Sequence, residues 1–424
     1  MKRNILVIAL ALAFPACSHD VPEVFDLNTG TSATKTSFEV LREYDSNLRD
    51  EGIWSSIEEE ARAEDSVTKA TSTNLIGMSS GFLSCLTAGR IHSVIGTYES
   101  RDLNGDPIRV SGRILYPKQG KIKNMIIVSH YTIGSNAEAP SENFSFEGIY
   151  AALGYVVVIA DYIGFGVTKD MVHPYLQANT TARNVIDMAV AARPFLKNRG
   201  IVPESDEVIL VGYSQGGATT MHVQRLLETD EEYAGTFKIK INYAGSGPYD
   251  IARTYDYSIE KDKTGIPCAI PMIIQGMSIG MERPLDMFFF FKEPLLTHYR
   301  EWLNSKKYTV SQISALIGTN YLSEILTANA RDKSNPETAR FYQELRKNSI
   351  PNNYYPQAPV YMFHSEDDQT VPFVNSQLMQ RQYTIYNVHT GGDVKVEYDF
   401  GHYGNHQQGA LKFILKVAVI LSKS

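Results

Sequence analysis

The sequence is poor in cysteine and has no excess of positive charge. Its 424 residues hold 3 cysteines, and 40 lysines and arginines stand against 47 aspartates and glutamates. Binding of a phosphate backbone needs a concentrated basic face, so the formal net charge of −7 argues against nucleic acid as a partner. Three cysteines are too few for a disulfide framework, and Cys85 and Cys268 suit small buried apolar positions equally well.

Apolar runs long enough to span a bilayer are also missing, and the apolar segment at the N-terminus is short. Two basic residues precede NILVIALALAF (residues 4–14), which is typical of a secretory signal peptide. The segment ends in FPAC, and this order resembles a bacterial lipoprotein cleavage box. The resemblance implies a signal peptide over residues 1–16 and a lipid on Cys17, in the bacterial cell envelope. Simple secretion with cleavage nearby is the alternative.

Two regions follow before the main fold is expected to begin. Residues 17–35 are polar and rich in turn-forming residues, which suits a tether between a lipid anchor and a folded domain. Residues 36–85 begin with charged side chains mixed with spaced apolar ones, so we expect an N-terminal helical segment there.

Continuous apolar runs then recur along the chain and predict a parallel sheet. Strands that are buried on both faces lack alternation of polar and apolar residues, and such runs occur at residues 125–130, 155–162, 207–214, 358–367 and 394–400. Helical patterns lie between them, so the sequence predicts an α/β fold with a mostly parallel, doubly wound sheet. Upstream, β-rich stretches flank the turn signal LNGD (103–106), which predicts a hairpin.

One long insertion interrupts this alternation. Residues 248–356 contain helix-like stretches rich in aromatic residues and methionine, so we expect a helical cap between the core segments 86–247 and 357–424. Four consecutive phenylalanines, 288–291, lie in its middle. They have two interpretations: an apolar wall for an acyl chain, because binding pockets are mainly apolar, or the core of the cap itself.

The run EVILVGYSQGGATT (207–220) ends a buried strand on a hydroxyl that glycines surround. Gly212 and Gly216 flank Ser214 in a G-x-S-x-G pattern, after a strand and before a helix, which is the context of a nucleophile elbow. Such a turn projects the serine above the sheet and aims the following backbone N–H groups at a developing oxyanion. We expect Ser214 to be a nucleophile; the alternative is a serine that only shapes the turn.

A serine nucleophile needs a base and an acid that orients the base, and in this type of fold both follow the serine. The stretch HSEDDQTVP (364–372) resembles the HGxxDxxVP turn of many α/β-hydrolases. This match puts Asp368 in the place of the acid, while Asp367 and Glu366 are interpreted as a solvated acidic turn.

The last loop of the chain, DFGHYGNHQQGALKF (399–413), offers two candidate bases. His402 directly follows a predicted strand, as in many relatives of the fold. His406 opens the final predicted helix in HQQGA, which resembles the HGGAA of secreted lipases. We choose His406 and keep His402 as the alternative.

A second oxyanion donor is expected from the loop that follows an earlier strand. The stretch SHYTIGS (129–135) resembles the HGTTG of secreted lipases, with Tyr131 in place of the first glycine. By that match, the backbone N–H of Tyr131 or of Thr132 would act together with that of Gln215.

A larger block carries a resemblance to a family. Residues 161–193, DYIGFGVTKDMVHPYLQANTTARNVIDMAVAAR, resemble the DYxGxG…HPYL…A…D…RAA block of secretory lipases and esterases, which include fungal secreted lipases and bacterial secreted esterases. The resemblance extends over most of the chain. It implies an α/β-hydrolase with a helical lid that acts on carboxylic esters without metal or cofactor. It also implies structural roles for Asp161 and His173, in holding loops near the site.

The sequence therefore predicts a secreted or lipid-anchored serine esterase or lipase. Ser214, His406 and Asp368 would act through an acyl-enzyme on a small or lipid ester, and the protein would meet a membrane only through its N-terminal anchor. One alternative is a serine peptidase of the same fold, although no carboxylate pair for a substrate amine is evident in the cap. The other is a non-catalytic surface lipoprotein that binds a ligand, although every residue type of the triad is present.

Overall fold

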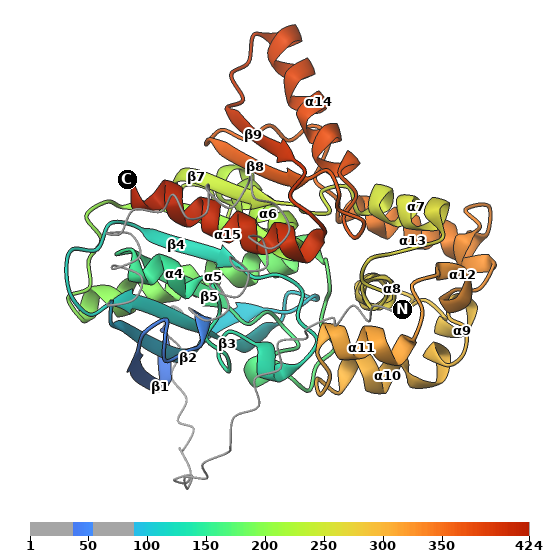
Figure 1. Ribbon diagram of the computed structural model, residues 1–424, viewed down its shortest axis with the longest axis horizontal. Coiled ribbons are helices and arrows are strands. Elements are labelled where there is room, and N and C mark those ends of the chain that lie inside the picture. The colour runs from blue at the N-terminus through green and yellow to red at the C-terminus, as the bar shows by residue number, and fades with distance from the viewer. Residues whose placement is uncertain (1–36, 54–88, 424) are drawn as a thin grey trace, which may run out of the picture. The chain divides into compact units, whose positions relative to one another are not determined.

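A nine-stranded sheet runs through the part of the chain that the computed structural model describes, residues 37–53 and 89–423 (Figure 1). Its strand order is β1-β2-β3-β5-β4-β6-β7-β8-β9. The strands are β1 (Glu39–Ser46), β2 (Ile91–Arg101), β3 (Pro107–Pro117), β4 (Met125–Ser129), β5 (Val156–Ala160), β6 (Glu207–Tyr213), β7 (Lys238–Gly245), β8 (Val360–Ser365) and β9 (Val396–Gly401).

Most of this sheet is parallel, as the unalternating apolar runs predicted. β4 pairs in parallel with both β5 and β6, and the parallel pairing continues through β7 and β8 to β9. β2 and β3 form the predicted antiparallel hairpin, and β3 joins the sheet by an antiparallel pairing with β5. The carboxyl ends of the parallel strands therefore meet at one edge, where α/β sheets carry their ligand sites.

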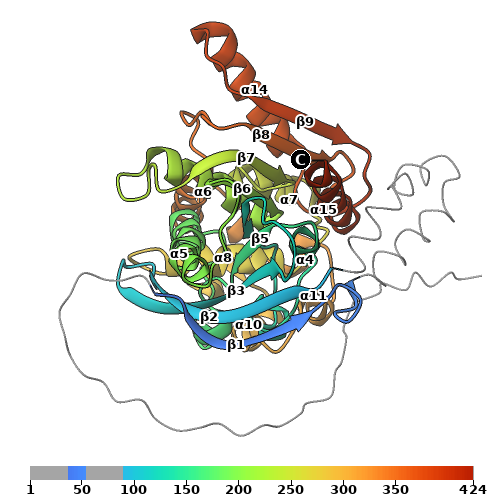
Figure 2. The same cartoon turned by 90° about the vertical axis from the view of Figure 1, so that its left-hand side faces the viewer.

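Helices cover both faces of the sheet (Figure 2). α5 (Ala178–Asn198) and α6 (Gln215–Thr229) pack on one face, and α4 (Gly148–Ala152) and α15 (His406–Ser422) pack on the other. Neighbouring strand residues alternate between the two cores: Ile127 faces the α5 side, whereas Ile126 faces the α15 side. Because both neighbours are buried, neither face of the strand can be polar, which explains the continuous apolar runs.

The insertion between β7 and β8 is helical, and we call it the cap. It contains α7 (Ile251–Lys261), α8 (Ala269–Ile279), α9 (Met287–Phe290), α10 (Leu295–Asn304), α11 (Val310–Ile317), α12 (Leu322–Ile325) and α13 (Pro336–Lys347). These helices share a core of their own, and Phe290 and Phe291 are buried in it. Within the described residues, three short 3-10 helices, η1 (Asn136–Glu138), η2 (Gly166–Thr168) and η3 (Asn329–Arg331), and α14 (Val374–Thr390) complete the elements.

The prediction of an N-terminal helical segment is wrong for the first part of that segment. Residues 39–46 form β1, which pairs antiparallel with β2. The pairing is supported by Phe38, whose ring occupies the space that a side chain on Gly96 would need. Such a contact between distant parts of the chain leaves no local pattern, so the mixture of charged and apolar residues suggested a helix.

Several sequence-based expectations lie outside the described residues. These are the signal peptide, the tether, the lipid on Cys17, residues 54–85 of the helical segment, and Cys85. Cys268 is buried and has a free thiol. Among the described ranges, no helix combines the length and the hydropathy that a membrane span requires.

Candidate active site

Ser214 lies at a sharp turn between β6 and α6. Its backbone has φ 58° and ψ −123°, a strained conformation for a residue with a side chain. The turn needs glycine at its flanks: a Cβ on Gly212 would lie 2.1 Å from the carbonyl oxygen of Gly216, and a Cβ on Gly216 would lie 1.9 Å from the carbonyl oxygen of Ser129. The glycines therefore let strand, turn and helix pack closely enough to project the serine.

His406 and Asp368 lie in line with this serine. His406 Nε2 is 2.7 Å from Ser214 Oγ, and His406 Nδ1 is 2.5 Å from Asp368 Oδ2. All three side chains are buried. A carboxylate oxygen can only accept, so Nδ1 carries the proton and Nε2 is the acceptor for the serine hydroxyl. This is the arrangement in which a histidine can take a proton from a serine.

The loops that hold His406 and Asp368 are fixed by hydrogen bonds between side chains and backbone groups. Asn405 caps α15 by accepting from the N–H groups of Gln407 and Gln408, so the helix begins at His406. The Tyr213 hydroxyl donates to the His406 carbonyl at 2.7 Å. On the other side, the second oxygen of Asp368, Oδ1, accepts from the N–H groups of Thr370 and Val371, both at 2.9 Å.

Burial alone raises the pKa of the Asp368 carboxyl, but the electrostatic interaction and the hydrogen bond with His406 outweigh it and hold the pKa below its ordinary value. The carboxylate therefore stays ionised at neutral pH. The nearby His364 is buried and bonded to Ser376 Oγ and to the Val371 carbonyl; burial lowers the pKa of its imidazole to about 4. It is neutral at pH 7, so Asp368 is the charged group of this loop that faces His406.

The alternative candidates lie at the surface. The side chain of His402 is 76% exposed, and its Nδ1 is 3.0 Å from Asp367 Oδ1. Glu366 lies on the same exposed turn, 3.9 Å from His402 Nε2. Ser214 is not among their contacts, so the structure separates this surface group from the buried group of Ser214, His406 and Asp368.

The expected oxyanion donors come from two elements. Gln215 is the first residue of α6, where a backbone N–H has no acceptor within the helix and the helix dipole favours negative charge. Thr132 follows β4 and lines the same cavity as Ser214, whereas Tyr131 does not line it. The Thr132 hydroxyl lies 2.7 Å from the Tyr175 hydroxyl.

A small, mainly apolar cavity adjoins Ser214. Its volume is about 30 Å³, and none of its lining side chains is charged: Thr132, Tyr175, Leu176, Ser214, Pro248, Thr254, Thr264, Ile266, Ala269, Ile270, Ile273, Thr370 and Val371. The cap contributes Thr254 of α7, the segment between α7 and α8, and α8 itself, but not the phenylalanines 288–291. These phenylalanines do not line this cavity: Phe290 and Phe291 lie in the core of the cap, and Phe288 is 74% exposed.

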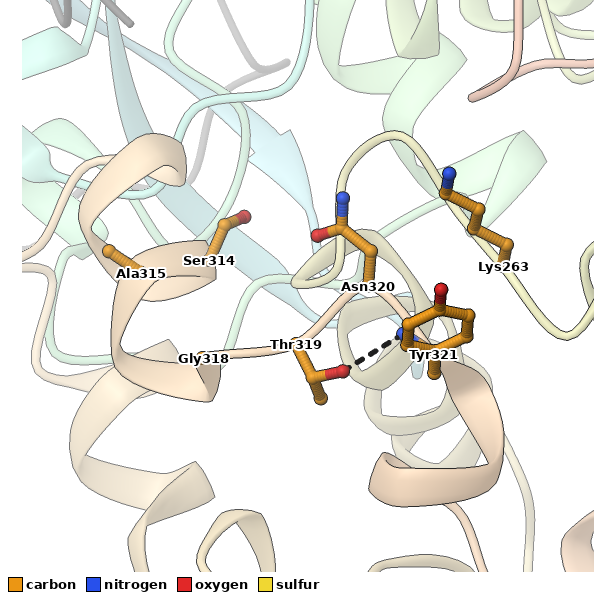
Figure 3. A pocket seen from close by; sticks show the side chains of 7 residues that line it. All are labelled: Lys263, Ser314, Ala315, Gly318, Thr319, Asn320 and Tyr321. Atoms are coloured by element: carbon orange, nitrogen blue, oxygen red, sulfur yellow. Dashed lines mark hydrogen bonds between the residues drawn. The ribbon is translucent and has the colours of Figure 1, made fainter. Parts of the chain in front are cut away.

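A larger hollow, which we call the cap basin, opens on the surface of the cap (Figure 3). It has a volume of about 550 Å³ and is lined by Lys263, Ser314, Ala315, Gly318, Thr319, Asn320 and Tyr321. The backbone N–H of Thr264, a residue of the Ser214 cavity, donates to the Asn320 carbonyl. The basin is larger than the Ser214 cavity, but no histidine or carboxylate lines it that could form a triad with Ser314. Nowhere in the described ranges do three His, Cys, Asp or Glu side chains gather as a metal site would require.

Comparison with known proteins points to one family. A model of the secretory lipase family matches residues 146–412, more than half of the chain. No curated protein matches the sequence.

Solved structures share the fold at low sequence identity. The rice cell wall degrading esterase LipA from Xanthomonas oryzae has a TM-score of 0.68 and 24% identity, over 81% of this chain and 92% of the esterase. Lipase A from Candida antarctica in its closed state has a TM-score of 0.55 and 13% identity, over 90% of this chain and 82% of the lipase. At these identities the similarity shows the fold alone, which is that of the α/β-hydrolases.

Proposed function

Because the chain belongs to the secretory lipase family and is a carboxylic-ester hydrolase, we propose that it cleaves its substrate through Ser214, His406 and Asp368. The observation that carries this proposal is the buried series of hydrogen bonds from Ser214 Oγ through His406 to Asp368. A serine hydroxyl is a weak nucleophile at neutral pH, and this arrangement supplies both the base and the charge that stabilises the base once it is protonated.

The reaction proceeds in two halves. His406 Nε2 accepts the proton of Ser214 as Oγ attacks the ester carbonyl, and the oxyanion is held by the backbone N–H groups of Gln215 and Thr132. The alcohol leaves with the proton from His406, which leaves an acyl-enzyme. Water, deprotonated by His406, then attacks the acyl-enzyme, and His406 returns this proton to Ser214 Oγ as the acid is released. Each oxyanion donor is expected to contribute about 10²–10³ in rate.

The cavity supports a short acyl group in the observed arrangement of the cap. With a volume of about 30 Å³ the cavity leaves little free space, so longer chains require α8 or its neighbouring segment to move. The absence of charged lining favours an ester over a peptide, because a peptidase that anchors a charged terminus needs an opposite charge beside its nucleophile.

We further propose that the protein works outside the cytoplasm and is anchored by a lipid on Cys17. Membership of a secretory family and the order of residues at the N-terminus support this location. Mass spectrometry of the N-terminus in the native host tests the anchor. An unmodified N-terminus, or a Cys17→Ser protein released no more than wild type, contradicts it.

A panel of p-nitrophenyl esters, from acetate to palmitate, beside aminoacyl-anilides tests the proposed activity. We expect hydrolysis of esters and not of anilides, and loss of that hydrolysis in Ser214→Ala with an unchanged circular dichroism spectrum. Near-wild-type turnover by folded Ser214→Ala would show that the serine is structural. Preferred hydrolysis of the anilides would favour the peptidase alternative, and inactivity on all of them would favour a ligand-binding lipoprotein.

A further inference from the structure

His173 is a buried histidine in the segment between η2 and α5, and it contacts the residue that follows the nucleophile. His173 Nδ1 lies 2.7 Å from the carbonyl oxygen of Ile163, and His173 Nε2 lies 3.0 Å from Gln215 Nε2. A carbonyl can only accept, so Nδ1 carries the proton. Nε2 is then free to accept a hydrogen bond from the side-chain amide of Gln215.

The backbone around His173 is tightly constrained. A Cβ on Gly164, whose φ is +92°, would lie 2.7 Å from the His173 Cα atom, so only glycine permits this approach of the two backbones. Tyr162 and Leu176, on either side of the segment, have positive φ angles of 63° and 59°. Such conformations cost energy and persist where the surrounding structure imposes them, often at functional sites. The imidazole is thus presented from a rigid support.

The cap also packs on this support. A Cβ on Gly276 of α8 would lie 2.3 Å from the Tyr175 carbonyl oxygen, and the side chain of Gln177 donates to the Gly276 carbonyl at 2.9 Å. The segment around His173 is therefore held between the sheet edge and α8, which reduces its freedom to move away from Gln215.

The side chain of Gln215 depends on this histidine. It is 1% exposed, and its Oε1 atom has no hydrogen-bond partner in the part of the chain that the structure describes. A buried amide with an unsatisfied oxygen costs about 1–3 kcal/mol, so an apolar side chain would suit the packing better. The bond to His173 gives a reason for glutamine at this position.

We propose that His173 is a positioning residue for the oxyanion hole: by holding the Gln215 side chain, it fixes the direction of the Gln215 backbone N–H. The inference rests on the proposed function, in which that N–H stabilises the oxyanion. The side-chain amide and the backbone N–H belong to the same residue, at the start of α6. The backbone N–H there has no acceptor within the helix, so helical hydrogen bonds do not fix its direction.

The electrostatic surroundings keep the imidazole in the form that this role requires. Burial first, and then the positive charge of Lys306, lower the pKa of His173 well below its ordinary value. The ring is therefore neutral across the working range, and its Nε2 lone pair stays available to Gln215. A protonated ring would carry a proton on Nε2 as well, and this N–H would face the N–H of the Gln215 side chain, which is also a donor.

A double-mutant cycle tests the proposal, with p-nitrophenyl acetate as substrate. His173→Phe keeps a buried ring without the acceptor, and Gln215→Met removes the donor but keeps the backbone N–H. We expect each single variant to lower kcat about 10–100-fold with little change in KM, because a donor that is misdirected by less than 1 Å loses part of its contribution. The double variant should be no worse than either single variant.

A second readout and a matched control separate positioning from folding. An alkylboronic acid forms a tetrahedral adduct with a serine nucleophile, and its affinity should fall by the same factor as kcat. His222→Phe is the control: His222 is also buried, its pKa is lowered to about 3 by burial, and its Nε2 faces the Asn348 carbonyl. We expect that variant to lose stability but to keep kcat per folded molecule.

Two results overturn the proposal. One is a folded His173→Phe enzyme with wild-type kcat, and the other is a double variant whose loss equals the product of the single losses. If His173→Phe does not fold, Gln215→Met carries the test alone, since unchanged kcat in that variant also overturns it. The proposed function fails separately, by an active Ser214→Ala enzyme, so the two failures are distinguishable.

Discussion

The carbonyl oxygen of Ser129, at the end of β4, lies 1.9 Å from the point that a Cβ on Gly216 would occupy. Backbone cannot yield as a flexible side chain can, so any larger residue at 216 must push α6 away from the sheet. The start of α6 carries the Gln215 N–H, and Ser214 precedes it. The close packing of Gly216 on the Ser129 carbonyl therefore fixes the positions of both the nucleophile and the oxyanion donor at the edge of the sheet.

Gly216→Ala is expected to lower kcat at least about 100-fold, because a displacement of about 1 Å at the reacting groups has effects of this size. Gly105→Ala is the control. Gly105 has φ +86° with no atom within 4 Å of its hypothetical Cβ, so this variant should cost about 1–2 kcal/mol of stability and leave kcat unchanged. Ester assays and urea unfolding of both variants measure the difference. Equal kcat in the two variants would contradict the steric argument.

His406→Ala is expected to lower kcat by about a thousandfold or more, because the base of the proposed triad is lost. His402→Ala removes a histidine of the same loop that is exposed and bonded to Asp367, and it should change kcat less than about threefold. Initial rates on p-nitrophenyl acetate compare the two. An active His406→Ala enzyme beside an inactive His402→Ala enzyme would reverse the assignment.

Ile273→Ala in α8 is expected to shift the preference among acyl lengths toward longer chains, since it enlarges a cavity of about 30 Å³. Phe290→Ala provides the matched comparison, because Phe290 is fully buried in the core of the cap and does not line that cavity. Phe290→Ala should cost about 3–5 kcal/mol of stability and lower the activity on all esters by the same factor. The ratio of kcat/KM for butyrate, octanoate and palmitate decides. A changed preference among acyl lengths in Phe290→Ala but not in Ile273→Ala would favour the interpretation of the phenylalanines as a wall for the acyl chain.

The sheet could be predicted from the sequence where its strands are buried on both faces. β4, β5, β6 and β8 are such strands, and their apolar runs can be recognised without knowledge of neighbours. β9 was also predicted, although its side chains are half-buried or exposed. β7 was not predicted: Lys238 and Lys240 interrupt its apolar residues, and its first half is half-exposed or exposed. β1 was missed because its pairing with β2 depends on a distant contact with Gly96. Strands at or near solvent leave a weaker pattern than strands in the middle of a sheet.

The residues of the candidate site also differ in how well the sequence predicts them. Ser214 and Asp368 stand in local motifs, and Asn405 with Gln408 forms a capping box that marks the start of α15 at His406. That box is a local signal that distinguishes the two histidines, since it places His406 at the helix start. The cavity residues Ile270 and Ile273 have no such signal. They reach Ser214 only because the cap folds back over the sheet edge.

Lys306 is a buried cation between the cap and the core. It is 6% exposed, its Nζ donates to the Leu303 carbonyl at 3.2 Å, and it lies 4.7 Å from the ring centroid of Phe165. No carboxylate within the described residues forms an ion pair with it. Burial lowers its pKa from the ordinary 10.5 to about 8. The folded state therefore bears the cost of burying a charge, which corresponds to about 3 kcal/mol below pH 8.

Lys306→Met is expected to stabilise the protein at neutral pH, because a side chain of similar length fills the site without a charge. The folded pKa lies below the unfolded one, so the unfolded chain binds more protons between pH 8 and 10.5, and wild-type stability from this group rises with pH across that window. The gain of the variant should fall from about 3 kcal/mol at pH 7 to under about 1 kcal/mol at pH 10. Urea unfolding at both pH values measures it, with Lys169→Met at an exposed lysine as the control. A gain that does not change with pH, or a loss at pH 7, would contradict the buried-charge argument.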